Sequence, residues 1–191
     1  MPRSSLRVVV LLFTLLLASV LAIRTIRSYS SHLLAQQAET DIGWGRLEQA
    51  RSHLERAVSL TSLDPARRVE LARVEGALAR WRDSEAARER QLVELAAATR
   101  LNPLDGELWA GYGAALTRAE RYEAADDALG EALERDPRNA YYWGLIGRLR
   151  EAEGRFEEAL SAYRTAEEIR PGSVQPLIQR MEERLREGRG E

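Results

Sequence analysis

The stretch that decides the fold occurs twice: residues 106–137 read GELWAGYGAALTRAERYEAADDALGEALERDP, and residues 140–171 read AYYWGLIGRLREAEGRFEEALSAYRTAEEIRP. The two segments align at a constant offset, and the same offset carries Pro103 onto Pro137 and Pro137 onto Pro171. Recurrence at one offset of about 34 residues indicates an internal repeat. The matched pairs are Trp109 with Trp143, Gly113 with Gly147, Tyr122 with Phe156, Ala125 with Ala159, Ala132 with Ala166, and Pro137 with Pro171.

Within each unit the apolar residues have the spacing of two helices. In the first unit, one stripe runs from Trp109 through Gly113, and a second begins at Tyr122. Pro137 ends the second helix, because proline cannot continue it. The small residues Gly113 and Ala125 would let the two backbones approach closely. Each unit is therefore predicted to be a pair of amphipathic helices joined by a tight turn.

These two units, residues 106–173, resemble consecutive tetratricopeptide repeats (TPR). That family has Trp in the first helix, small residues where the helices meet, an aromatic residue at the start of the second helix and a proline after it. The resemblance assigns Trp109 and Trp143 to packing between helices rather than to ligand stacking. The sequence departs from the family at Arg150 and Glu167, where apolar groups are usual. The resemblance implies an all-α superhelix of stacked hairpins with a concave binding face.

The same pattern weakens on both sides of these repeats. Residues 28–105 are predicted to form degenerate TPR-like hairpins, the first of them beginning near Ser31. Residues 66–103 form a longer unit that is either a hairpin with an insertion or one longer bent helix, interrupted near Arg82 to Ser84. Residues 174–191 are predicted to be a capping helix and tail, because the last hairpin would otherwise expose its apolar face. We expect about four hairpins plus this cap.

Residues 1–27 are predicted to form an N-terminal membrane anchor. Residues 8–23 are apolar throughout most of their length and carry no charge. As a helix this run covers about 24 Å, and snorkelling of the flanking arginines closes the gap to a hydrocarbon core of about 30 Å. The alternatives are a secretory signal cleaved after Ala22 and a buried soluble helix. Arg24 and Arg27, directly after the apolar run, favour an uncleaved anchor.

The orientation of this anchor is nearly balanced by charge. Two arginines lie on each side of the apolar run, and only the free N-terminal amine favours a cytoplasmic N-terminus. We therefore expect a single-pass membrane protein whose body lies on the extracytoplasmic, periplasmic side.

The charged residues exclude several classes of function. All 28 basic residues are arginine, and the chain has no Lys and no Cys. Disulfides, thiol catalysis, cysteine-based zinc sites, Lys Schiff bases and Walker-type phosphate loops are therefore excluded. Residues 28–191 contain 24 Arg against 30 acidic residues, a net charge of −6, which does not suit a nucleic-acid partner. His32 and His53 lie outside any metal-binding motif, so we expect no metal, no cofactor and no small-molecule substrate.

The resemblance places partner binding on the concave face of the first helix of each repeat. Small residues there would leave room for a partner, with Tyr141 as an anchor and with Arg118 and Arg148 available to carboxylates. The Lys and Asn with which chaperone-binding TPR proteins clamp a terminal carboxylate are missing. The competing interpretation is that these are ordinary solvated positions. The predicted groove comprises Glu107, Ala110, Ala114, Thr117 and Arg118 in one repeat, and Tyr141, Gly144, Arg148, Glu151 and Ala152 in the next.

The sequence therefore predicts a non-catalytic, membrane-tethered TPR scaffold or assembly factor that binds other proteins of an envelope complex. One alternative is an accessory structural subunit that contacts a membrane complex mainly through its N-terminal helix. Another is a secreted periplasmic TPR adaptor after signal cleavage. An enzyme is disfavoured, because the sequence offers no pairing of nucleophile with base, no phosphate loop and no metal-ligand set.

Overall fold

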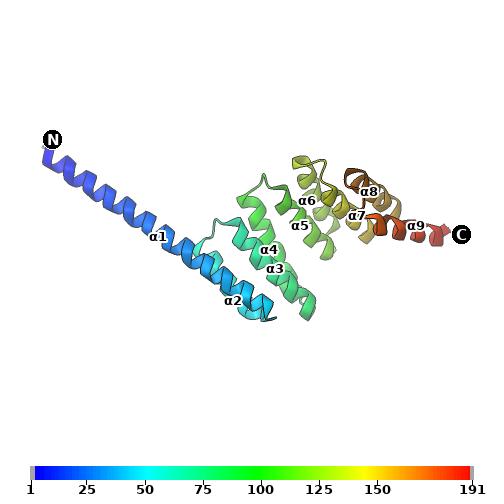
Figure 1. Ribbon diagram of the computed structural model, residues 1–191, viewed down its shortest axis with the longest axis horizontal. Coiled ribbons are helices and arrows are strands. Elements are labelled where there is room, and N and C mark those ends of the chain that lie inside the picture. The colour runs from blue at the N-terminus through cyan, green and yellow to red at the C-terminus, as the bar shows by residue number, and fades with distance from the viewer. Residues whose placement is uncertain (1–2, 190–191) are drawn as a thin grey trace.

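The computed structural model describes residues 3–189, with side chains over residues 9–187, as a curved stack of helices (Figure 1). The helices pair in chain order into four hairpins, and the last helix packs on the fourth hairpin. Within the described residues there is no strand, so the predicted all-α fold of about four hairpins plus a cap is confirmed. Residues 1–2 of the predicted anchor and 190–191 of the predicted tail lie outside the described chain. The helices are α1 (Arg3–Gly43), α2 (Leu47–Leu60), α3 (Pro65–Arg82), α4 (Glu85–Leu101), α5 (Gly106–Arg118), α6 (Tyr122–Arg135), α7 (Ala140–Ala152), α8 (Phe156–Ile169) and α9 (Gln175–Arg189).

The apolar N-terminal segment and the first helix of the first hairpin are one continuous helix, α1, of 41 residues. Its apolar stretch projects away from the stack (Figure 1), and the described side chains from Val9 to Ile26 are exposed. Packing begins at Ser31, which is buried and donates a hydrogen bond to the carbonyl of Ala57 on α2 (3.1 Å). No break in secondary structure therefore separates the predicted anchor from the stack.

Residues 66–103 form a hairpin, so the alternative of one bent helix is wrong. α3 ends where Asp83 enters the left-handed region (φ 47°), a conformation that a short polar side chain tolerates. Ser84 then caps α4 by accepting a hydrogen bond from the backbone N–H of Ala87 (3.3 Å). α3 and α4 have 18 and 17 residues, against 13 and 14 for α5 and α6. The predicted insertion therefore lengthens both helices of this hairpin.

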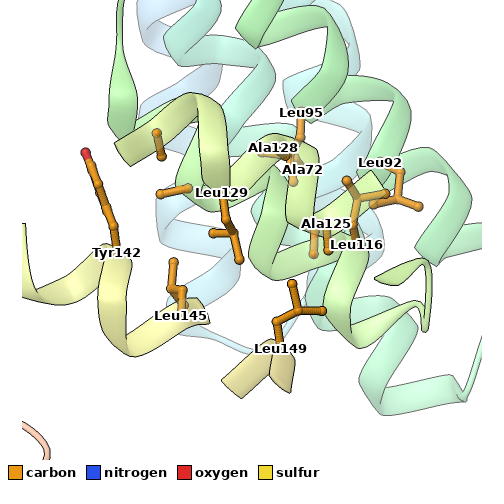
Figure 2. Close-up of a cluster of buried hydrophobic side chains, with 13 residues drawn as sticks. Ala72, Leu92, Leu95, Leu116, Ala125, Ala128, Leu129, Tyr142, Leu145 and Leu149 are labelled. Atoms are coloured by element: carbon orange, nitrogen blue, oxygen red, sulfur yellow. The ribbon is translucent and has the colours of Figure 1, made fainter. Parts of the chain in front are cut away.

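The core runs along the stack as alanines flanked by leucines. In its central part, Leu129 of α6 lies between Leu116 of α5 and Leu145 of α7 (Figure 2). All three side chains are buried, and burying a leucine stabilises a fold by about 2 kcal/mol. Leucines at helical spacing on successive helices thus join neighbouring hairpins into one core.

Two repeated glycines set the distance between the helices of a hairpin. A Cβ atom on Gly113 would lie 2.7 Å from Cγ of Leu129, and one on Gly147 would lie closer still to Cε1 of Tyr163. Both contacts are shorter than carbon atoms tolerate. The third and fourth hairpins therefore require glycine at positions 113 and 147. The close approach of the two helices that was predicted at Gly113 is present in the structure.

The two positions that depart from the TPR pattern make polar contacts in place of apolar ones. Arg150 is half-buried, and its guanidinium lies 2.5 Å from Oδ1 of Asp126 on α6 and 2.9 Å from Oε2 of Glu153. Glu167 accepts hydrogen bonds from the backbone N–H groups of Gly172 (2.5 Å) and Val174 (3.1 Å). The arginine links α6 to α7, and the glutamate fixes the turn that leads into α9.

Candidate protein-binding groove

The first helices of the hairpins line the inner side of the stack. α5 contacts α7 directly, although α6 separates them in the chain. In a curved stack of hairpins, the helices on the concave side are the ones that meet in this way. α5 and α7 therefore present the face on which the groove was predicted, and a shared hollow places Arg80 of α3 beside Arg118 of α5.

The predicted groove residues differ in what they offer to a partner. Glu107, Arg118, Tyr141 and Arg148 are exposed, with Tyr141 exposing 59% of its surface. Ala114, Thr117 and Glu151 are half-buried, Ala152 is exposed and Gly144 is buried.

The expectation for Ala110 is corrected by the structure. Its side chain is completely buried in the core cluster that also contains Ala72 of α3 and Leu95 of α4. The methyl group is part of this core, so it offers no surface to a ligand.

Glu151 is already engaged within the protein. Its Oε2 atom accepts a hydrogen bond from the Tyr163 hydroxyl of α8 (3.1 Å) and lies 2.7 Å from the guanidinium of Arg180 on α9. Burial raises the pKa of Tyr163 well above its usual value, and the charge of Glu151 raises it further. The predicted groove residue Glu151 thus joins α7, α8 and α9 instead of facing a partner.

Four arginines follow the inner face: Arg80 on α3, Arg118 on α5, Arg148 on α7 and Arg170 directly after α8. Within the described residues, none of their guanidinium groups forms a salt bridge or a hydrogen bond, although most arginines of the stack pair with carboxylates. Although the residue as a whole is exposed, neighbouring groups partly desolvate the guanidinium of Arg118 and lower its pKa, and the positive charges of Arg80 and Arg148 lower it further. The inner face therefore carries unneutralised positive charge.

Two hollows hold these arginines in pairs. The first, of about 320 Å³, lies between the second and third hairpins. Arg80 and Arg118 line it together with Gln91, the ion pair of Arg88 with Asp83, and small residues such as Ala79 and Ala115. The second, of about 200 Å³, lies between α7 and the start of α9. Its lining residues are Ala140, Tyr141, Gly144, Leu145, Arg148, Arg170, Ser173, Val174 and Leu177. Each hollow therefore combines two arginines that have no carboxylate partner in the described chain with small or apolar groups, and the first also contains the Arg88–Asp83 pair.

Sequence reasoning identified Arg118 and Arg148 but missed Arg80 and Arg170. The interval from Arg80 to Arg118 equals the interval from Pro65 to Pro103. Aligning the second hairpin with the third at that longer offset would therefore have paired Arg80 with Arg118. Arg170 lies outside the first helices, and only the turn into α9 brings it to the inner face.

The tryptophans and histidines have structural contacts. Trp109 and Trp143 are half-buried, and their indole N–H groups donate equivalent hydrogen bonds of 3.0 Å to the carbonyls of Pro103 and Pro137. Nδ1 of His53 lies 3.0 Å from Oδ2 of Asp41, across the first hairpin. In the part of the chain that the structure describes, no three His, Asp or Glu side chains are grouped to hold a metal ion.

One described helix is long and apolar enough to cross a membrane. It is the N-terminal helix α1, and none of its apolar stretch is buried against the stack. Its length and composition suit both a membrane span and a signal sequence.

Comparisons with known proteins place the stack among TPR folds. The family model of the tetratricopeptide repeat matches residues 140–173. A solved structure of MamA from Desulfovibrio magneticus RS-1 is 17% identical over 81% of this chain and 85% of that chain, with a TM-score of 0.66. TTC0263, a thermophilic TPR protein of Thermus thermophilus, is 24% identical over 81% of each chain, also with a TM-score of 0.66.

A third solved structure, that of pilF from Pseudomonas aeruginosa, is 18% identical over 84% of this chain and 71% of that chain, with a TM-score of 0.66. No curated protein sequence matches this chain significantly. At these identities the structural likeness concerns the fold. The chain therefore carries a tetratricopeptide repeat at residues 140–173, within a stack of helical hairpins that has the fold of TPR proteins.

Proposed function

We propose that this protein is a non-catalytic, membrane-tethered scaffold that holds acidic segments of other proteins in its concave groove. TPR proteins typically mediate contacts between proteins, which supports the general role. The observation that carries the proposal is the row of inner arginines, Arg80, Arg118, Arg148 and Arg170, which have no carboxylate partner within the described chain.

Neighbouring positive charges repel one another, and a carboxylate brought by a partner relieves that repulsion. Guanidinium groups bind carboxylates through paired, charge-assisted hydrogen bonds. Residues 28–191 carry a net charge of −6, so their general field disfavours acidic ligands everywhere except at such a local cationic surface. Tyr141, exposed beside Arg148, supplies an amphipathic anchor for the same segment.

The exposed apolar half of α1 supports the tether. A tether raises the effective concentration of the groove toward partners in the same membrane. Residues 1–27 act as an uncleaved anchor in this proposal, and the body faces the periplasm, where it serves an envelope complex.

The binding test uses the purified full-length protein and a fluorescent peptide rich in Glu and Asp. The charge-reversing double variant Arg118→Glu with Arg148→Glu should bind this peptide at least about tenfold more weakly, since each lost charge-assisted pair contributes about 1.5 kcal/mol or more. The matched control is Arg56→Glu with Arg100→Glu, which reverses two exposed arginines outside the groove. Equal binding by the two variants would place the interface elsewhere.

The exposed apolar helix also favours a second function, that of an accessory subunit whose main contact is α1 itself. Deleting residues 1–27 separates the two. A complex that survives the deletion supports the groove, whereas a complex that is lost while peptide binding persists supports the helix contact.

A further inference from the structure

The loop between α2 and α3, residues 61–64, lies beside the end of the apolar segment. We propose that this loop is a second membrane contact, lying in the lipid headgroup layer with Leu63 at the bilayer surface. The inference rests on the proposed tethering by α1. In addition, the first hairpin lies against anionic phospholipid headgroups, which fix the orientation of the stack relative to the membrane.

The depth of the loop relative to the bilayer follows from the continuity of α1. Arg24, Arg27 and Ser28 line one hollow together with residues 60–64, so the loop lies beside that part of the helix. α1 rises without a break, which places Arg27 about 6 Å beyond Ile23, the last residue of the apolar run. The headgroup layer on each side of a bilayer is about 5 to 7 Å thick. A span that ends at Ile23 therefore brings residues 61–64 into that layer.

The side chains at this level suit a lipid surface. Leu63 exposes 80% of its surface at the tip of the loop, and Tyr29 exposes 64% on α1. Arg24 and Arg27 are exposed and form no salt bridge within the described chain. An apolar tip with an aromatic ring and cations is the composition of membrane interfaces, since the cations attract lipid phosphates.

The one acidic residue of the loop is occupied within the fold. Asp64 caps α3, because its Oδ1 atom accepts a hydrogen bond from the backbone N–H of Ala66 (2.9 Å). Its Oδ2 atom lies 3.7 Å from the guanidinium of Arg67, whose closer partner is Glu70 (2.6 Å). The carboxylate is therefore turned to the start of α3, where the helix dipole offsets part of its charge, and Arg24 and Arg27 provide the positive charge at this level.

Hydrogen bonds fasten the loop to α1. A hydrogen bond of 2.8 Å joins the hydroxyl groups of Ser31 on α1 and Thr61 in the loop. The hydroxyl that accepts in this bond donates to the carbonyl of Ala57 on α2, whose oxygen lies 3.1 Å from Ser31 Oγ and 3.0 Å from Thr61 Oγ1. The depth of the loop is therefore set by the depth of α1.

The absence of cysteine makes a direct test clean, because any introduced cysteine is a unique labelling site. The full-length protein is labelled with an environment-sensitive fluorophore at Leu63→Cys, or at Ser62→Cys, which keeps the leucine. It is reconstituted into nanodiscs of phosphatidylcholine and phosphatidylglycerol that contain nitroxide lipids. Leu15→Cys reports on insertion of α1. Trp44→Cys, 75% exposed and about 30 Å beyond Ile23 at the far end of α1, is the control for the label itself.

We expect headgroup nitroxides to remove most of the emission from positions 62 and 63 and little from position 44, while acyl-chain nitroxides quench position 15. Quenching at position 15 with equal, weak quenching at positions 62, 63 and 44 overturns the loop contact and leaves the tether standing. Lack of quenching at position 15 overturns the tether, and the loop contact with it.

Discussion

The ring of Tyr163 on α8 lies against the backbone of Gly147 on α7, so closely that a Cβ atom at that glycine would overlap the ring. Gly147→Ala forces the helices of the fourth hairpin apart, and we expect it to lower the free energy of unfolding by about 2 to 3 kcal/mol. Urea denaturation followed by circular dichroism measures the change. Gly111→Ala, where no atom lies within 4 Å of the added carbon, is the matched control and should raise stability by up to about 1 kcal/mol. Equal effects of the two changes would contradict the packing argument.

The buried carboxylate of Glu75 on α3 depends on one cation. Its Oε1 atom lies 2.8 Å from Nε of Arg90 on α4, and its Oε2 atom has no partner within the described chain. Arg90→Ala leaves this carboxylate without its counter-ion, and we expect a loss of about 2 kcal/mol in the free energy of unfolding. Arg121→Ala, which removes an exposed salt bridge to Glu89, should cost less than about 1 kcal/mol. A larger loss of unfolding free energy for Arg121→Ala than for Arg90→Ala would show that burial does not determine how much these salt bridges stabilise the fold.

Glu167 predicts a dependence of stability on pH. The backbone N–H groups of Gly172 and Val174 lower the pKa of this carboxyl below its ordinary value. A lowered folded-state pKa stabilises the protein above the unfolded-state pKa, and this contribution disappears as the pH falls through the folded-state value. Glu167→Gln should therefore be less stable than the wild type at neutral pH, with the difference vanishing in acid. Denaturation midpoints across the acidic range measure this, and Glu168→Gln, at an exposed site, serves as the control.

Replacing an inner arginine should weaken the binding of acidic peptides without lowering the stability of the fold. The pKa of Arg118 is lowered by burial and by its neighbours Arg80 and Arg148, so the folded state disfavours the charged guanidinium. Arg118→Gln should leave the free energy of unfolding unchanged or raise it by about 0.5 kcal/mol at low salt, less at high salt, while weakening binding of acidic peptides. Thermal denaturation and fluorescence anisotropy on the same samples provide both values. Arg56→Gln on α2 should change neither, and a marked loss of stability in Arg118→Gln alone would show that the side chain holds the fold together.

The fold was predictable where the repeat is regular. The constant spacing between the two repeats identified the third and fourth hairpins. The structure has the same geometry in both repeats, since the indole N–H groups of Trp109 and Trp143 each donate to a proline carbonyl. The second hairpin has a longer period, and its turn depends on the left-handed conformation of Asp83, which the sequence alone left open. The continuity of α1 could have been predicted, because residues 23–31 contain no glycine or proline that would end a helix.

The candidate groove was predictable only in part. The resemblance to TPR proteins assigned Arg118, Tyr141 and Arg148 to the inner face, and the structure has all three exposed. It could not show that Ala110 is buried in the core, since an alanine suits both a surface and a core. Nor could it show that Glu151 is used by Tyr163 and Arg180, because the position of α9 determines that contact.

The uninterrupted course of α1 has a mechanical consequence. A chain that leaves a bilayer through a flexible linker can swivel freely, whereas in the proposed tether the apolar segment and the first helix of the superhelix are one continuous helix. Any rotation imposed on one end is transmitted to the other. With α1 tethered as proposed, a partner that pulls on the far repeats would exert torque on the membrane segment, and a change in bilayer thickness would re-orient the whole superhelix.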